Sequence, residues 1–176
     1  MPLMADSPDV PSPIDLRVMA DAREWARSAM VKRPWRTDFF NKIADQLPPG
    51  PLRVLEIGSG PGFLAEVLLE RNPNIEYVAL DFSTAMHDLA RDGLAERADR
   101  VRFVVADFTQ NTWARGLAAF EAIVTVQAVH ELRHKRRAPD LYGVIRDLLR
   151  ARGQLLMCDH FVGEGGMSDG DLFHDT

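Results

Sequence analysis

The sequence contains little of what would assign the chain to several specialised classes of protein. Cys158 is the one cysteine among 176 residues, which excludes an intrachain disulfide and a zinc site built from several cysteines of one chain. No apolar run is long enough to cross a bilayer, and the N-terminus is rich in proline and aspartate, unlike a secretory signal. We therefore expect a cytoplasmic protein that does not act in a membrane.

Positive charge is not in excess either. The 21 lysines and arginines are outnumbered by 26 aspartates and glutamates, so the formal net charge is −5. This balance disfavours a general electrostatic attraction to nucleic acid. The one basic run, Arg133 to Arg137, either meets an anionic acceptor at the mouth of the cleft or is a solvated loop, and the pattern favours the loop. Hydrophobic residues make up 46% and charged residues 27% of the chain, as in an ordinary globular domain with a substantial core.

A strand, a glycine-rich turn and a helix follow one another near the middle of the chain. The apolar run Leu52–Ile57 predicts a buried strand, and Gly58, Gly60 and Gly62 come directly after it. A helical pattern begins at Phe63. This layout brings backbone N–H groups close to a bound small molecule. Glycine suits the turn because a Cβ would block close approach and because positive φ angles are expected.

Two acidic residues flank this motif. Asp81 follows a second predicted strand, 75–80, and a carboxylate at this distance from the glycines is suited to hold a ribose diol. The glycine spacing differs from the G-x-G-x-x-G pattern that faces a pyrophosphate. Glu56, just before the first glycine, would repel such an anion but suits a ligand with an ammonium group.

The pattern Glu56-x-Gly58-x-Gly60-x-Gly62, followed by Asp81, resembles the cofactor signature of class I S-adenosylmethionine-dependent methyltransferases. The resemblance covers residues 14–162 and implies S-adenosyl-L-methionine as cofactor and S-adenosyl-L-homocysteine as product. It also implies that the residue pair after the third strand, Asp107 and Phe108, binds the adenine ring, with Phe82 on the other ring face. The residues predicted to bind the cofactor are Glu56, Gly58, Ser59, Gly60, Gly62, Asp81, Phe82, Asp107, Phe108 and Gln127.

Alternating strands and helices predict an α/β fold, a doubly wound Rossmann-like and mostly parallel sheet with helices on both faces. Five strands are recognisable, at residues 52–57, 75–80, 101–105, 122–126 and 154–158. Ligands of such sheets bind at the carboxyl ends of the strands, so the glycine turn, Asp81, Asp107 and Gln127 are expected around one crevice. Gly153 is predicted to end the last helix, and Cys158 to be a buried core thiol.

Two helices are expected before the first strand. The first spans about 14–31, Pro34 interrupts it, and Thr37 is a plausible N-cap of the second. Together they resemble the N-terminal lid of small-molecule methyltransferases. Trp35 and Arg36, between the helices, either lean over the cofactor or pack at the helix junction, and the pattern favours packing.

The predicted domain has three parts: a disordered N-terminus at 1–13, the cofactor-binding domain at 14–162, and a flexible or edge-covering tail at 163–176. The complete family fold normally adds two strands after the fifth, and the residues from 159 onward are too few for them. The fifth strand is then an edge, which we expect the tail to cover or a second copy to pair with, as a homodimer.

A second motif predicts a function of a different class. Residues 130–134 read His-Glu-Leu-Arg-His, the H-E-x-x-H pattern of zinc metallohydrolases. No third ligand is obvious downstream, where Asp159, His160 and Glu164 are the available side chains. The stretch begins directly after a buried strand, and Pro139 indicates that the next helix starts later, so we expect no metal site. His130 is instead the candidate catalytic residue, as a base at the end of the fourth strand.

The sequence thus predicts an enzyme that transfers a methyl group to a small-molecule acceptor, through oxygen, nitrogen or carbon, by in-line displacement. No Asn-Pro-Pro-Tyr sequence and no cysteine nucleophile follow the fourth strand, which disfavours two kinds of methylation of larger substrates. A small acceptor therefore remains by elimination. A non-catalytic subunit that binds the cofactor as a scaffold is the other alternative.

Overall fold

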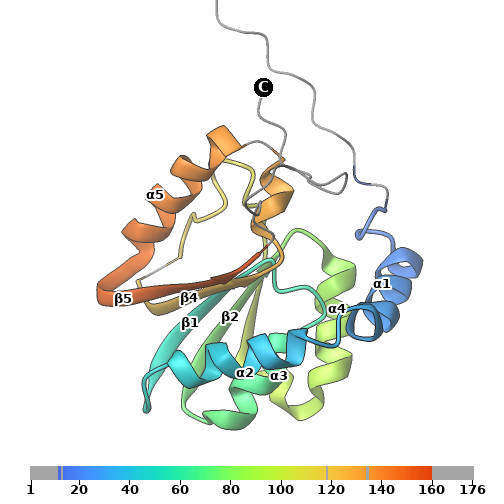
Figure 1. Cartoon of the computed structure of the whole chain (residues 1–176), viewed down its shortest axis with the longest axis horizontal. Helices are drawn as coiled ribbons and strands as arrows, with labels where there is room; N and C mark the ends of the chain where they lie inside the picture. The colour runs from blue at the N-terminus through green and yellow to red at the C-terminus, as the bar shows by residue number, and fades with distance from the viewer. Residues whose placement is uncertain (1–11, 13, 118, 134, 160–176) are drawn as a thin grey trace, which may run out of the picture.

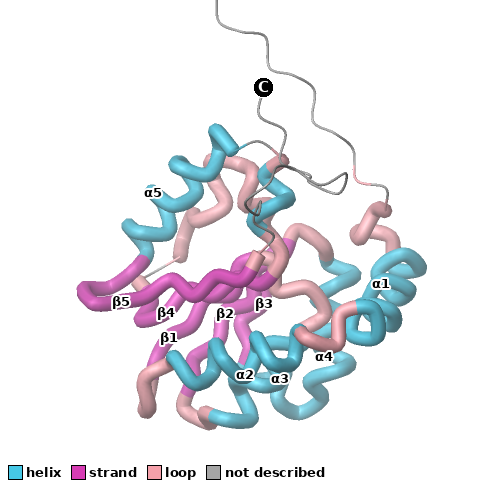
Figure 2. The backbone as a smooth tube through the Cα atoms, viewed as in Figure 1, coloured by secondary structure: helices cyan, strands magenta, loops and turns pink. Residues whose placement is uncertain are grey.

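The computed structural model describes Ser12 and residues 14–117, 119–133 and 135–159. At its centre lies one parallel sheet of five strands in the order β3-β2-β1-β4-β5 (Figures 1 and 2). The strands are β1 (Leu52–Ile57), β2 (Ile75–Asp81), β3 (Val101–Val105), β4 (Phe120–Val126) and β5 (Leu149–Cys158). The predicted fold class is confirmed. The predicted tail at 163–176 and, except for Ser12, the predicted disordered segment lie outside the described residues.

Helices pack on both faces of the sheet. They are α1 (Met19–Lys32), α2 (Arg36–Gln46), α3 (Phe63–Arg71), α4 (Thr84–Leu94) and α5 (Ala138–Leu148), with short 3-10 helices η1 (Ala95–Arg100), η2 (Val129–Leu132) and η3 (Lys135–Arg137). Figure 2 shows α5 on one side of the sheet and α2 and α3 on the other. Among the described residues, no helix is both long and apolar enough to span a bilayer.

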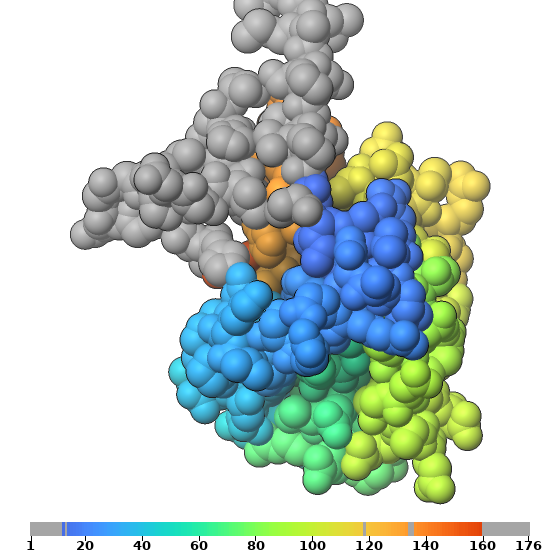
Figure 3. Space-filling model, turned by 90° about the vertical axis from the view of Figure 1, so that its right-hand side faces the viewer, coloured from blue at the N-terminus to red at the C-terminus, as the bar shows by residue number. Residues whose placement is uncertain are grey.

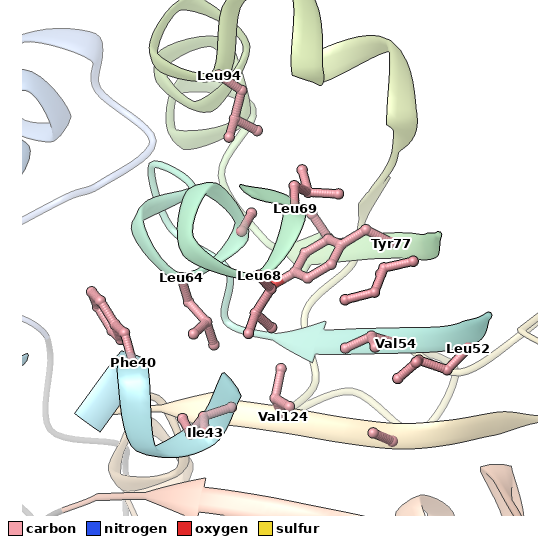
Figure 4. Packing of buried hydrophobic residues seen from close by; sticks show 14 residues of the cluster. Phe40, Ile43, Leu52, Val54, Leu64, Leu68, Leu69, Tyr77, Leu94 and Val124 are labelled. Atoms are coloured by element: carbon pink, nitrogen blue, oxygen red, sulfur yellow. The ribbon is translucent and has the colours of Figure 1, made fainter. Parts of the chain in front are cut away.

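Two apolar clusters hold these layers together, because the central strands are buried on both faces. One joins β1, β2 and β4 to α2 and α3, and the other joins the opposite face of the sheet to α5 and η2. Figure 4 shows side chains that meet in the first cluster: Phe40, Ile43, Val54, Leu64, Leu68 and Tyr77. Each such side chain contributes about 1.5–3 kcal/mol by burial.

The two N-terminal helices form, but their starts differ from the prediction. The first helix begins at Met19 because Asp15 caps a tight turn: its carbonyl oxygen accepts from the Val18 N–H and its carboxylate from the Arg17 N–H. Thr37 is not the N-cap of α2. That helix begins at Arg36, with Trp35 as its N-cap, so Thr37 lies inside the first turn. Pro34, whose ring restricts φ to a helical value, comes directly before the cap.

The junction between α5 and β5 also corrects the prediction. The strand begins at Leu149, so Gly153 does not end the helix but lies inside the strand. The register there advances from the pair Phe120/Leu149 to the pair Ala122/Gln154, which makes a bulge on β5. A Cβ on Gly153 would lie 2.9 Å from the Arg150 carbonyl oxygen and 3.1 Å from that of Phe120, so the bulge requires glycine.

The far end of β5 differs as well. Cys158 is only half-buried, so it is not a core thiol. Within the described residues β5 pairs with β4 alone and therefore forms one edge of the sheet, next to the carboxyl end of β4.

Candidate functional site

A cleft of about 550 Å³ opens at the carboxyl ends of the strands. It lies between the sheet and the N-terminal segment, and Figure 3 shows α1, in blue, lying against the yellow-green α4. Of the eleven residues predicted for the site, ten line this cleft: Glu56, Gly58, Ser59, Gly60, Asp81, Phe82, Asp107, Phe108, Gln127 and His130. Parallel strands thus bring together side chains from four loops, as the topology predicts.

The three glycines of the turn all have positive φ, at +69° for Gly58, +53° for Gly60 and +82° for Gly62, but each has a different neighbour. A Cβ on Gly58 would lie 2.3 Å from the Cβ of Ala128, in the loop after β4. Next to Gly60 there is open space. Gly62 does not line the cleft, and its Cβ would lie 3.1 Å from the Cβ of Ala90 on α4. Close approach of a ligand therefore explains only Gly60.

Asp81 holds the glycine turn while it faces the cleft. Its Oδ2 accepts a hydrogen bond from the Gly60 N–H at 2.8 Å, and its Oδ1 accepts one from the Ser83 N–H at 2.9 Å. Burial raises the pKa of the Asp81 carboxyl, against the opposing effect of these bonds. A carboxylate has about four lone-pair sites, so two remain for hydroxyl donors.

Glu56 is buried at the end of β1, and the Tyr77 hydroxyl donates a hydrogen bond of 2.6 Å to its Oε2. Burial raises the pKa of Glu56 to about 8, although the Tyr77 bond lowers it, and Asp81 raises it further. The carboxyl group is therefore mostly protonated near neutral pH until a cation approaches. The sequence analysis missed Tyr77, whose phenol in a mostly apolar strand was the available signal.

At the other end of the cleft, the ends of β2 and β3 supply aromatic and acidic groups. Phe82 is 40% exposed and Phe108 also lines the cleft. Asp107 Oδ1 accepts hydrogen bonds from the N–H and the hydroxyl of Thr109. Ser59 is buried, and its hydroxyl has no hydrogen-bond partner among the described residues.

The end of β4 meets the N-terminal helices. Gln127 adopts a φ of +52°, and its N–H donates to the Cys158 carbonyl oxygen at 2.7 Å. Arg36 Nε donates to Gln127 Oε1 at 2.5 Å, and the guanidinium lies over the Trp25 ring. Trp35 does not line the cleft and is 38% exposed. Of the pair at the helix junction, Arg36 alone reaches the site.

His130 is held by two acidic residues. Its Nδ1 lies 2.8 Å from Asp159 Oδ1, and its Nε2 lies 3.4 Å from Glu131 Oε1. Burial lowers the pKa of His130, but the bonds with Asp159 and Glu131 outweigh it and raise the pKa to about 9. Asp159, which the sequence suggested only as a zinc ligand, is the orienting partner of the imidazole.

The zinc reading of this stretch has no support. The motif begins in the 3-10 helix η2, which ends with Arg133 in a left-handed conformation, so the one-face alignment of an α-helical H-E-x-x-H is absent. His134 lies outside the described residues. Among those that are described, no group of three or more histidine, cysteine, aspartate or glutamate side chains could hold a metal ion.

Comparison with known proteins gives consistent matches. Residues 54–153 match a family model described as a methyltransferase domain. The chain is 32% identical over 148 residues to a probable nonribosomal peptide synthetase of Salinispora arenicola, covering 84% of this chain and 2% of that protein. It is 38% identical over 77 residues to a demethylmenaquinone methyltransferase of Deinococcus radiodurans, covering 44% of this chain and 31% of that one. The chain therefore spans less than a third of either relative.

Solved structures match as well. The glycopeptide N-methyltransferase MtfA, in complex with S-adenosyl-L-methionine, is 27% identical with a TM-score of 0.58, over 67% of this chain and 51% of that one. A protein of Methanococcus maripaludis described as a putative S-adenosyl-L-methionine-dependent methyltransferase is 18% identical with a TM-score of 0.64. That match covers 84% of this chain and 66% of the other, and at this identity it supports the fold alone.

Proposed function

The chain belongs to the class I S-adenosylmethionine-dependent methyltransferases, whose domain model matches residues 54–153, and from this we propose that it transfers a methyl group from S-adenosylmethionine to a small-molecule acceptor. The observation that carries the proposal is the meeting of Glu56, the glycine turn and Asp81 in one cleft. A glycine turn occurs in many kinds of site, but here Asp81 matches the ribose hydroxyls of this cofactor and Glu56 matches its ammonium group.

The residues of the cleft fit the cofactor in size and in chemistry. Small-molecule sites occupy about 300–1,000 Å³, and this cleft has about 550 Å³. The free lone pairs of Asp81 suit the ribose hydroxyls. Asp107 would accept from the adenine amino group, with Phe82 and Phe108 against the ring faces.

The methionyl end of the cofactor carries an ammonium group, and Glu56 is the proposed partner of that group. An approaching cation favours the ionised carboxyl, so the raised pKa of Glu56 would fall on binding and one proton would leave the site. Gly58 and Gln127 would border the same end from β1 and β4.

The bound cofactor supplies an electrophilic methyl group, and the protein's contribution is position and exclusion of water. In-line displacement needs the attacking atom opposite the leaving sulfur. Fixing that geometry is worth about 7–11 kcal/mol at most. Trp25 and Phe40 from the N-terminal helices line the cleft and would shield the reacting atoms from solvent.

His130 is the proposed base for an oxygen or nitrogen acceptor. It lines the cleft beside Gln127 and is oriented by Asp159. With a pKa of about 9, roughly one ring in a hundred is neutral at pH 7, so base catalysis would strengthen as the pH rises toward that value.

A small molecule is the proposed acceptor, through oxygen, nitrogen or carbon. The similar proteins include a demethylmenaquinone methyltransferase, whose name refers to such an acceptor. The formal net charge of −5 argues against a general attraction to nucleic acid.

Isothermal titration calorimetry of the purified chain with S-adenosylmethionine, S-adenosylhomocysteine and NAD tests the proposal. We expect binding of the two sulfur compounds and not of NAD, and loss of binding in Asp81→Ala. A matched control is Asp88→Ala, an exposed carboxylate on α4 that pairs with Arg91. Absence of binding by the wild-type chain would refute the proposal.

Mass spectrometry of a panel of hydroxyl, amine and carbon acceptors then tests transfer. We expect a product 14 Da heavier for at least one acceptor. Cofactor binding without any methylated product across the panel would favour a scaffold subunit over an enzyme.

A further inference from the structure

Arg36 is a buried cation without an acidic partner in the described part of the chain. It is 5% exposed, yet it lines the cleft. Its Nε donates to Gln127 Oε1, a neutral acceptor, and one face of the guanidinium lies over the Trp25 ring. Among the described residues, the two terminal nitrogens of Arg36 donate no hydrogen bond, and neither is completely buried. These two nitrogens are therefore accessible from the cleft.

A second cation lies beside the first. Arg33 is the C-cap of α1, and its carbonyl oxygen accepts a hydrogen bond from the Arg36 N–H at 3.1 Å. Arg33 also lines the cleft. Burial, followed by the charge of Arg33, lowers the pKa of Arg36 to about 10. Two neighbouring guanidinium groups repel each other, and an anion between them would relieve the repulsion.

The acidic residues that line the cleft do not supply this anion. Five acidic residues line the cleft, and each of them interacts with another group. The pairs are Asp15 with Arg17, Glu56 with Tyr77, Asp81 with the Gly60 and Ser83 N–H groups, Asp107 with Thr109, and Glu131 with Arg133. In the described residues no carboxylate lies within ion-pair distance of Arg33 or Arg36.

A buried charge is costly unless it is paired, and a planar guanidinium fork matches a carboxylate with two parallel hydrogen bonds. We propose that Arg36, assisted by Arg33, forms a carboxylate-binding subsite in the cleft, beside Gln127 at the carboxyl end of β4. The inference rests on the proposed function, because both sources of the carboxylate follow from it. The carboxylate belongs either to the methionyl end of the cofactor or to an acidic acceptor.

Calorimetry with matched ligands separates these sources. S-adenosylhomocysteine carries the amino acid end, whereas 5′-methylthioadenosine keeps the adenosine and the sulfur but has neither carboxylate nor ammonium group. Both are titrated into the wild type, Arg36→Met, Arg36→Lys and Arg33→Met. Arg27→Met is the control, because it removes an exposed arginine of α1 that pairs only with Glu24.

If the cofactor is the source, Arg36→Met weakens S-adenosylhomocysteine roughly ten- to a hundredfold, as expected for a charge-assisted hydrogen-bonded pair. Arg36→Lys and Arg33→Met weaken it less, and methylthioadenosine affinity stays the same in every variant. Unchanged methylthioadenosine binding also shows that the cleft of each variant is folded.

If the acceptor is the source, S-adenosylhomocysteine affinity does not depend on Arg36. Benzoate, titrated into the protein saturated with S-adenosylhomocysteine, then binds the wild type and not Arg36→Met, and neutral benzamide binds neither.

Two results overturn the inference. One is that neither S-adenosylhomocysteine nor benzoate affinity depends on Arg36. The other is that methylthioadenosine affinity falls as much as that of S-adenosylhomocysteine, which would make Arg36 a purely structural residue. If the wild type binds neither adenosyl compound, the proposed function fails, and the benzoate titration without cofactor still tests the subsite.

Discussion

Tyr77 and Glu56 form a polar contact between the neighbouring strands β2 and β1, inside an apolar core. Tyr77 is fully buried, and its ring packs among residues of α3 while its hydroxyl reaches the cleft carboxyl. A buried polar pair is costly unless its members satisfy each other. Because Tyr77 donates to Oε2, it holds Glu56 in one orientation, with Oε1 left for a ligand.

Tyr77→Phe is expected to keep the packing and weaken S-adenosylhomocysteine binding roughly two- to tenfold at pH 7.5. The Tyr77 bond lowers the pKa of Glu56, so its loss raises that pKa further above 8 and leaves less carboxylate for the ammonium group. The deficit should shrink at pH 9. Calorimetry from pH 7 to 9 measures it, with Tyr142→Phe as control, since that hydroxyl contacts Met157 outside the cleft. Equal affinities for Tyr77→Phe and wild type at every pH would refute the positioning role.

The raised pKa of His130 predicts how turnover depends on pH. If the neutral ring is the base, kcat rises about tenfold per pH unit from 7 and levels off near 9. Asp159→Asn removes the strongest of the bonds that raise the pKa, so its plateau should begin at lower pH. The measurement is kcat against pH on the first acceptor identified. A wild-type profile without an inflection in this range, or a His130→Gln variant that retains full activity, would exclude base catalysis.

At the scale of elements, the glycine turn packs closely against two neighbours and borders open space at a third position. Gly58 admits the loop after β4, Gly60 borders open space, and Gly62 begins α3 in a left-handed conformation against α4. One sequence motif thus does three separate jobs. Spacing alone predicts the turn but does not distinguish these roles.

Gly62→Ala is expected to destabilise the protein by about 1–2 kcal/mol, because alanine resists the left-handed conformation and its Cβ would crowd Ala90. Gly93→Ala is the matched control, since Gly93 lies inside α4 with no atom near its Cβ, and there the change should stabilise by about 0.5–1 kcal/mol. Thermal unfolding measures both. S-adenosylhomocysteine affinity should be unchanged in Gly62→Ala, and a large loss would instead support the direct cofactor contact that the motif suggested.

At the scale of the whole molecule, β5 is an edge of the sheet within residues 14–159, and among these residues no strand pairs with its outer side. We propose that a second copy pairs there. Sedimentation velocity should then reveal a dimer that dissociates on dilution, and amide exchange in residues 154–158 should be slower at high protein concentration. A monomer at all concentrations would argue against this pairing.

The stability of the free protein should depend on pH in a stated direction. The folded-state pKa values of His130 (about 9) and Glu56 (about 8) are raised above 6.5 and 4.5, so their protonated forms favour folding. The contribution of Glu56 is lost as the pH rises from about 4.5 to 8, and that of His130 as the pH rises from about 6.5 to 9. The melting temperature should therefore fall from about pH 6.5 to 9, and less so with bound S-adenosylhomocysteine, which favours ionised Glu56. A melting temperature that stays constant from pH 6.5 to 9 would contradict the raised values.

His87 changes the pH dependence of folding stability in the opposite direction. It is fully buried, and neither ring nitrogen has a hydrogen-bond partner in the described part of the chain. Burial lowers its pKa from 6.5 to about 4. Its contribution is present above pH 6.5 and lost as the pH falls toward 4. His87→Leu should stabilise the fold and remove this acid sensitivity, and a leucine variant that melts lower than wild type at pH 4.5 would contradict the assignment.

Much of the fold and of the candidate site could be predicted because the signals are local. Apolar runs bounded by turn residues predict the strands, and Glu56, the glycines and Asp81 follow directly from their spacing. The residues at which helices and strands begin were harder to predict. Thr37 has the chemistry of a cap but lies inside the first turn after Pro34, and Gly153 has the chemistry of a helix end but relieves a bulge. A glycine or threonine suits several positions, and its neighbours in space select one.

The amino-acid sequence alone therefore determined the class of fold, the cleft at the strand ends and most residues around it, since these depend on periodicity and on short-range order. Tertiary structure decided what those residues contact. Tyr77 on β2 donates a hydrogen bond to Glu56 on the neighbouring strand β1. Arg36 contacts Gln127, 91 residues away in the chain, and Asp159 orients His130. Such contacts set charge and orientation in the cleft, and they arise from packing between distant segments, which no local pattern in the chain records.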